Sequence, residues 1–139
     1  MIRRAACLSL LLGCVGNAPV EPPSLDLAMF ASRVQPVLAA RCASPACHGS
    51  ERRRLRVYAP GFFRSDPRRV HRDEPITADE LAANERSAAA FVVEAPSAAE
   101  SLLVTKPLHQ VAHLGAQVFT ASDDEHAALL AWIRTGAIP

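Results

Sequence analysis

Two cysteines and a histidine stand close together in the segment CASPACH, which holds Cys42, Cys47 and His48. Three kinds of chemistry use such a set. Two thiols can add across the vinyl groups of a haem while the adjacent imidazole binds the iron. The same two thiols can instead close a disulfide in an oxidising compartment. Thiolates and imidazole can also bind zinc, with a distant histidine completing a tetrahedral set.

The position of His48 directly after Cys47 favours haem attachment, because the local turn then places the imidazole under the iron. Haem c sites usually have two residues between the cysteines. Here four residues separate Cys42 from Cys47, and Ser44-Pro45 suits a bulge away from the haem ring. A disulfide remains the alternative, since this spacing also suits a small disulfide loop. Zinc is less favoured, because an adjacent cysteine and histidine make a tetrahedral geometry awkward.

The N-terminus predicts an exported protein. Arg3 and Arg4 precede a short apolar run, and Cys14 follows that run at once. This pattern resembles a bacterial lipoprotein signal, with residues 1–13 as the signal peptide and a diacylglycerol on the Cys14 thiol. The run is too short to span a bilayer. Because Val15 rather than aspartate follows the cysteine, the pattern indicates an outer-membrane lipoprotein on the periplasmic side of the cell envelope.

Cleavage before Cys14 would leave 126 of the 139 residues, which is enough for one domain. Loss of the two N-terminal arginines would change the formal net charge from +1 to −1. Cys42 and Cys47 would then be the only cysteines without a lipid. The proline-rich stretch within residues 14–24 predicts an extended, lipid-anchored linker, and residues 25–139 are expected to form the domain.

Helical spacing of apolar residues from Leu27 to Arg41 predicts a helix that ends at Cys42. Pro36 lies inside this pattern. Either the helix kinks there, or a new turn begins with proline in its first position.

Three further segments have the serine or threonine and the glutamate of a capping box: Thr77–Glu80, Ser97–Glu100 and Ser122–Glu125. They predict a helix from residue 78 to about residue 90, a short helix before Pro107, and a final helix that stops near Gly136. We therefore expect an all-α domain with long irregular loops.

The segment 52–72 is rich in arginine and is broken by proline and glycine, so it is expected to form loops. It lacks a nucleic-acid-binding pattern, and an exported protein would not meet nucleic acid. Arginines of this kind can pair with haem propionates, face an acidic electron-transfer partner, or form a solvated surface. The arginines concerned are Arg52, Arg53, Arg54, Arg56, Arg64, Arg68, Arg69 and Arg72.

Two parts of the chain resemble the cytochrome c-like domains of bacterial exported proteins. The first is VQPVLAARCASPACHG, and the second is SLLVTKPLHQVAHLGAQVF followed by DDEHAALLAWIRTGA. The resemblance covers about residues 25–50 and 97–137, and the cysteine spacing departs from the usual one. It implies a class I cytochrome c-like fold, one covalent haem c bound through Cys42, Cys47 and His48, and one-electron transfer.

A second axial ligand for the iron is harder to assign. Small class I cytochromes typically use methionine, but Met29 lies ahead of the cysteines on the first helix. The histidine candidates are His71, His109, His113 and His126. His113 is favoured because it lies where the second ligand loop of the family would fall, with His109 or no sixth ligand as the alternatives. A site with two histidines should have a lower reduction potential than a methionine–histidine site.

The sequence thus predicts a haem c electron carrier, with iron bound by His48 and His113 and a periplasmic redox protein as partner. The alternative is a haem-free lipoprotein in which a Cys42–Cys47 disulfide supports a binding or structural role. No separate catalytic set of carboxylates, serine or thiolate is evident. An enzyme is therefore less favoured, and peroxide reduction at a five-coordinate haem is the form it would take.

Overall fold

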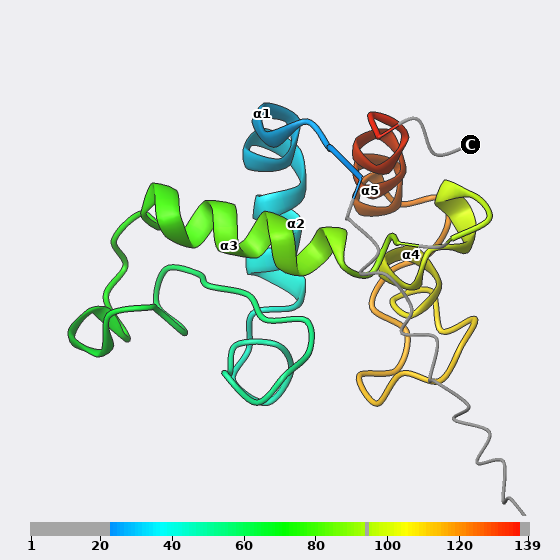
Figure 1. Cartoon of the computed structure of the whole chain (residues 1–139). Helices are drawn as coiled ribbons and strands as arrows, with labels where there is room; N and C mark the ends of the chain where they lie inside the picture. The colour runs from blue at the N-terminus through cyan, green and yellow to red at the C-terminus, as the bar shows by residue number, and fades with distance from the viewer. Residues whose placement is uncertain (1–22, 94, 137–139) are drawn as a thin grey trace, which may run out of the picture.

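The computed structural model describes residues 23–93 and 95–136. The signal peptide 1–13, the lipidation site Cys14 and most of the linker 14–24 lie outside the described residues. Within them the chain is all-α, as expected, and contains no strand (Figure 1). The elements are α1 (Leu27–Met29), η1 (Phe30–Val34), α2 (Gln35–Arg41), η2 (Pro67–Arg69), α3 (Ala78–Ala89), η3 (Ala98–Glu100), α4 (Leu102–Thr105) and α5 (Asp124–Arg134).

The first three elements form one helical run that passes Pro36 through a wider turn. Proline has no N–H, and its ring crowds the carbonyl four residues earlier. The helix therefore adopts π geometry over η1, where the Gln35 N–H donates to the carbonyl of Phe30, five residues back. α2 then begins at Gln35 with Pro36 as its second residue, so the proline lies in the first turn of a new α-helical segment but not in its first position.

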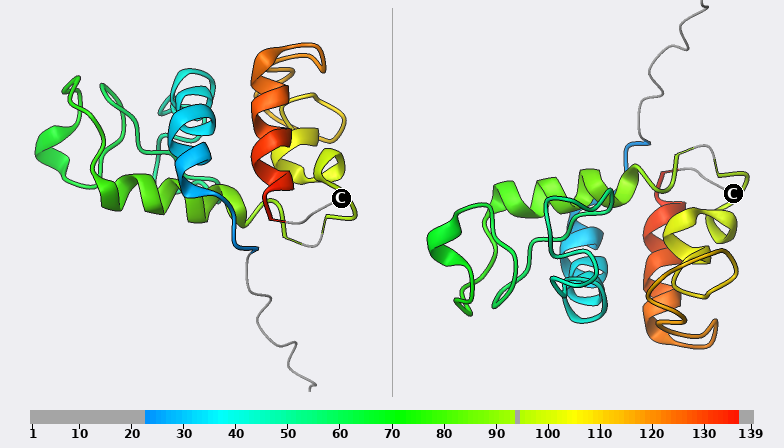
Figure 2. Two further views of the ribbon diagram at one scale, coloured as in Figure 1. Left: turned by 90° about the horizontal axis from the view of Figure 1, so that it is seen from above. Right: turned by 90° about the horizontal axis from the view of Figure 1, so that it is seen from below.

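This run packs beside α5 and provides much of the core (Figures 1 and 2). The rings of Phe30 and Trp132 lie 5.0 Å apart between centroids, and both side chains are fully buried. The Trp132 Nε1–H donates to the Asp26 carbonyl at 3.1 Å, and the Asp26 N–H donates to Thr135 Oγ1 at 3.0 Å. These two hydrogen bonds therefore join the start of the first helical run to the end of α5.

α3 lies across the first helical run, and its N-terminus has the predicted capping box (Figure 2). The Glu80 N–H donates to Thr77 Oγ1, and the Thr77 N–H donates to the Glu80 carboxylate.

Within the described part of the chain, no helix has the length and apolarity that crossing a bilayer requires.

The other two capping boxes predicted from the sequence were wrong. Ser97 precedes only a 3₁₀ turn, and its hydroxyl donates to the Glu100 carboxylate instead of capping a backbone N–H. α5 begins one residue later than expected, with Asp123 as its N-cap and no side-chain cap. The Asp123 carboxylate instead accepts the Thr120 N–H, because the turn ahead of the helix competes for it.

A buried ion pair joins the arginine-rich loop to α3. The Arg64 side chain donates to both carboxylate oxygens of Glu80, with the shortest contact at 2.8 Å, and both side chains are excluded from solvent. Glu80 also accepts the N–H and the hydroxyl of Ser65. Burial opposes the charge on Glu80, but these hydrogen bonds prevail and hold the pKa of the carboxyl at about 2.

Glu80→Gln should lower the free energy of unfolding by about 3 to 5 kcal/mol, because it leaves the Arg64 guanidinium buried without a counter-charge. The native carboxyl has a lower pKa than its ordinary value of 4.5. Its contribution is therefore complete above that value and is lost as the pH falls towards 2. Urea unfolding of both proteins between about pH 6 and about pH 3 should show the difference shrinking in acid.

Arg68→Gln is the matched control, because Arg68 pairs with Asp66 at the surface with its side chain largely in water. That change should alter the unfolding free energy by less than about 1 kcal/mol. Equal effects of the two substitutions would contradict a structural role for the buried pair.

Candidate functional site

The segment with both cysteines folds back on itself directly after α2. Cys42 is the C-cap of that helix, as predicted, and its N–H donates to the Leu38 carbonyl. The His48 N–H then returns to the Cys42 carbonyl at 2.9 Å, and the Cys47 N–H donates to the Ser44 carbonyl at 2.8 Å. These bonds close a compact loop, which we call the cysteine loop (residues 42–49), and they set the position from which the His48 ring projects.

Gly49 allows this loop to close. A Cβ atom on Gly49 would overlap the carbonyl oxygen of Ala43, which is backbone and cannot move independently of the loop. The Gly49 N–H also donates to the Ser44 carbonyl at 3.0 Å. The glycine is therefore needed for a close approach between two parts of the backbone.

The His48 ring is held in one tautomer. Its Nδ1 lies 3.0 Å from the carbonyl oxygen of Leu55. Because a carbonyl only accepts, Nδ1 carries the proton and Nε2 keeps its lone pair. Burial is the main cause that lowers the pKa of His48, and the neighbouring His113, Arg53 and Lys106 lower it further. The ring is thus kept neutral, which is the form that binds a metal.

His113 lies in the long loop after α4, and its ring is held in the same way. Its Nδ1 donates to the Ala116 carbonyl at 3.0 Å, so its Nε2 also keeps a lone pair. Gly115 lies against the ring, where an added Cβ would come within 3.0 Å of the His113 Cε1. In proteins, histidines that bind metals typically donate their other ring N–H to such an acceptor.

The two imidazoles lie together although 65 positions separate them in the chain. Their centroids are 6.1 Å apart and their planes differ by only 11°. Two metal–nitrogen bonds of about 2 Å, with about 1.2 Å from each nitrogen to its ring centre, span about 6.4 Å. The distance between the ring centres of His48 and His113 is therefore close to the distance between two imidazoles that share one metal ion, and their planes are nearly parallel.

The other candidate histidines are placed differently. His71 and His109 are exposed and have left-handed backbone conformations, with φ of 67° and 58°. The Nδ1 of His126, in the first turn of α5, donates to the Ala121 carbonyl, which lies before that helix begins. Met29 packs against the hydrophobic core. Of these residues, only His113 has a ring paired with that of His48 in the described residues.

The two thiols differ in exposure. Cys42 is buried, and this burial is the main cause that raises the pKa of its thiol to about 12. The nearby Cys47 raises that pKa further. Cys47 is half-buried, and both thiols are free. In residues 23–93 and 95–136, no three histidine, cysteine, aspartate or glutamate side chains lie together as a metal-binding group. The four side chains of the zinc hypothesis are therefore not gathered as one ligand set.

An extended segment, Leu55–Tyr58, carries the acceptor for His48, and no pattern in the sequence predicted this role. Successive residues of this segment form hydrogen bonds alternately to His48 and to α3. The Leu55 carbonyl and the Val57 N–H bond to the ring and the carbonyl of His48. The Arg56 and Tyr58 N–H groups instead donate to the side chains of Ser87 and Asn84 on α3.

Asn84 connects this segment to the first helical run. It is fully buried, and its amide donates to the Tyr58 carbonyl at 2.8 Å and to the Gln35 side chain at 2.9 Å. The Gln35 amide donates to the same Tyr58 carbonyl. Because buried polar groups are costly to leave unpaired, this network fixes the distance between α2, α3 and Leu55–Tyr58.

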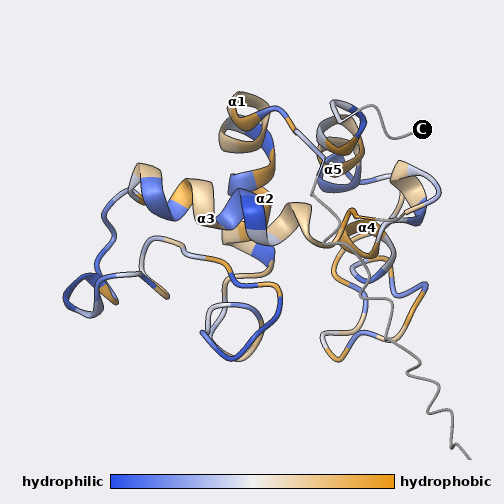
Figure 3. Ribbon diagram, in the orientation of Figure 1, coloured by the Kyte–Doolittle hydropathy of each residue, from blue (hydrophilic) through white to orange (hydrophobic). Residues whose placement is uncertain are grey.

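Apolar side chains are exposed on the loop that carries His113. Leu114 is fully exposed and Val111 is 40% exposed, and Figure 3 shows hydrophobic stretches on this loop. The cysteine loop lies on the same side of the molecule (Figure 1). Exposed apolar side chains of this kind are typical of a surface that binds a ligand or a partner.

Comparisons with known protein families, curated proteins and solved structures find no match to this chain. The chemistry of the site is therefore argued from its own residues.

Gly49→Ala should lower the free energy of unfolding by more than about 2 kcal/mol, because the cysteine loop must open to admit the methyl group. Gly61→Ala is the matched control. Gly61 has a φ of +71° but no atom near its missing Cβ, so that change should cost only about 1 kcal/mol of backbone strain. Denaturant unfolding measures both, and a smaller effect at position 49 than at position 61 would contradict the close approach.

Proposed function

We propose that this chain is a haem c electron carrier with a class I cytochrome c-like fold. The observation that carries the proposal is the pair of imidazoles, His48 and His113. Each has its Nδ1 engaged by a backbone carbonyl, which leaves a lone pair on its Nε2, and the two ring planes are nearly parallel with their centres 6.1 Å apart. The haem would be single and covalent.

Cys42 and Cys47 would attach the haem. Each thiol S–H would add across one vinyl C=C, so that a C–S bond forms and the hydrogen goes to the other vinyl carbon. This addition needs no oxidant. The hydrogen bond that closes the cysteine loop, from the His48 N–H to the Cys42 carbonyl, keeps both cysteines next to the proximal imidazole.

His48 and His113 would hold the iron, and bound haem would supply one-electron redox chemistry. The carbonyls of Leu55 and Ala116 would hold the two rings in orientation. Fixed ligands favour electron transfer, because little rearrangement is needed between redox states. With both axial positions filled, a carrier is favoured over an enzyme that reduces peroxide.

A lipoprotein signal at residues 1–13 would place this carrier on the periplasmic side of the cell envelope. Cleavage before Cys14 would leave a lipid anchor, and the proline-rich linker would separate the domain from the membrane. The partner would be a periplasmic redox protein. The apolar surface around Val111 and Leu114 would border the haem edge through which electrons pass.

His113→Ala should convert the low-spin absorption spectrum of the haem protein to a high-spin one, because the iron loses one strong-field ligand. His109→Ala is the matched control, since His109 lies four positions earlier in the same loop with its side chain exposed. It should leave the spectrum unchanged. A spectrum that responds to His109→Ala and not to His113→Ala would move the ligand to the other histidine.

A further inference from the structure

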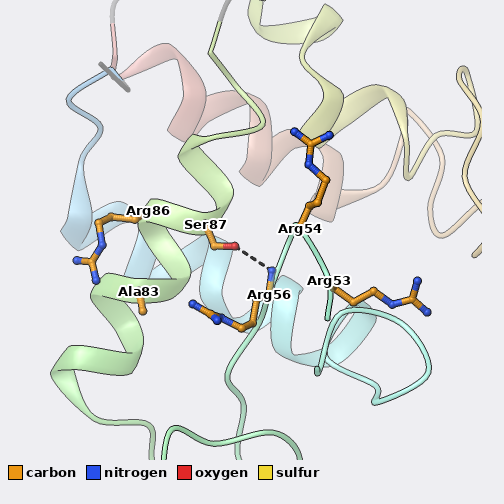
Figure 4. Close-up of a pocket in the computed structure, with 6 residues that line it drawn as sticks. All are labelled: Arg53, Arg54, Arg56, Ala83, Arg86 and Ser87. Carbon is orange, nitrogen blue, oxygen red and sulfur yellow. Dashed lines mark hydrogen bonds between the residues drawn. The ribbon is translucent and has the colours of Figure 1, made fainter. Parts of the chain in front are cut away.

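Four arginines line one depression between α3 and the segment that follows the cysteine loop (Figure 4). Its volume is about 320 Å³. We call it the arginine pocket, and its lining residues are Arg53, Arg54, Arg56, Ala83, Arg86 and Ser87. The lining residues include four arginines and no acidic residue, and Figure 4 shows that the Arg56 and Arg86 side chains extend towards the same side, whereas those of Arg53 and Arg54 extend in other directions.

Five of the described arginines, Arg41, Arg64, Arg68, Arg69 and Arg72, each form a salt bridge with a carboxylate. Arg33, Arg52 and Arg134 form none within the described residues and lie outside the pocket. By contrast, none of the four arginines of the pocket is within salt-bridge distance of a carboxylate among the described residues. Positive charge that the fold does not neutralise there favours binding of an anion from outside the domain.

Part of the pocket is fixed in position before any ligand binds. The Arg56 guanidinium lies over the Tyr58 ring at 5.6 Å, and its backbone N–H donates to Ser87 Oγ at 2.9 Å (Figure 4). Since Ser87 Oγ accepts that bond, its own hydroxyl proton is available to a ligand. Arg53 donates to the Ala46 carbonyl through one guanidinium nitrogen, which leaves its other N–H groups to bind elsewhere.

We propose that the arginine pocket binds an oxyanion of the phosphate class. Guanidinium groups bind phosphate through paired hydrogen bonds, and several of them together favour a ligand with more than one negative charge. The ligand would be a soluble phosphate or diphosphate, or the phosphate of a lipid headgroup. This site is separate from His48. Along the extended segment, Leu55 bonds to the His48 ring, whereas the next residue, Arg56, bonds to Ser87 on α3.

Isothermal titration calorimetry of the full exported chain in a non-ionic detergent tests the proposal. Inorganic pyrophosphate and short-chain phosphatidylglycerol are the two probes, and short-chain phosphatidylcholine is the uncharged reference. Arg56→Gln and Arg86→Gln should each weaken binding by about tenfold. Arg56→Lys keeps the charge but loses the paired hydrogen bonds, so it should also weaken binding.

Arg52→Gln is the matched control, because Arg52 is exposed in the same loop, forms no salt bridge within the described residues and does not line the pocket. It should change the affinity by less than about twofold. Tighter binding of pyrophosphate would identify a soluble anion as the ligand class, and tighter binding of phosphatidylglycerol would identify a headgroup. Either result supports the proposal.

Absence of saturable binding by both probes would overturn it. Equal weakening by Arg52→Gln and Arg56→Gln would also overturn it, because the attraction would then come from diffuse charge and not from a site. Neither the probes nor the heat of binding involves haem, so the result is independent of the proposed electron-transfer function.

Discussion

The hydrogen bond from His48 Nδ1 to the Leu55 carbonyl connects the chemistry of this chain to its fold. A ring on a short loop would otherwise sample several orientations, and its tautomer would depend on solvent. Leu55 in turn belongs to an extended segment that α3 holds through Ser87 and Asn84. The orientation of one imidazole therefore depends on how the first helical run, the connecting segment and α3 pack together. A change at any of these contacts would reach His48 through its two hydrogen bonds to this segment, from its ring to the Leu55 carbonyl and from the Val57 N–H to its own carbonyl.

A similar hydrogen bond holds the second imidazole, but its acceptor lies in the same loop as the ring. The Ala116 carbonyl fixes the His113 ring from within its own loop, and Gly115 lets that backbone pass close to the ring. One imidazole is thus supported by the body of the domain and the other by a surface loop with exposed apolar residues. We infer that the His48 side is the rigid half of the site. The His113 side would adapt more readily to the ligand, because fewer tertiary contacts hold it.

Much of the helical framework could be predicted, because periodicity, one capping box and the helix end at Cys42 are local features of the sequence. His113 could be selected only by its position relative to a resembled family, and the structure places its ring beside His48. The carbonyls that hold the two rings could not be predicted, since every residue has one and only the fold decides which is near. The Arg64–Glu80 pair was missed for a similar reason: 16 positions separate its members, and a run of arginines gives no sign of which one is buried.

The central claim is that Cys42 and Cys47 hold a haem between His48 and His113. The most direct test is the intact mass of the denatured protein, exported from a host with cytochrome c maturation machinery, together with haem staining of a denaturing gel. The account predicts a stained band and a mass increased by one haem, both lost in Cys42→Ser/Cys47→Ser. A haem-free chain two hydrogens lighter than its reduced form would contradict it, because the two thiols would then form a disulfide.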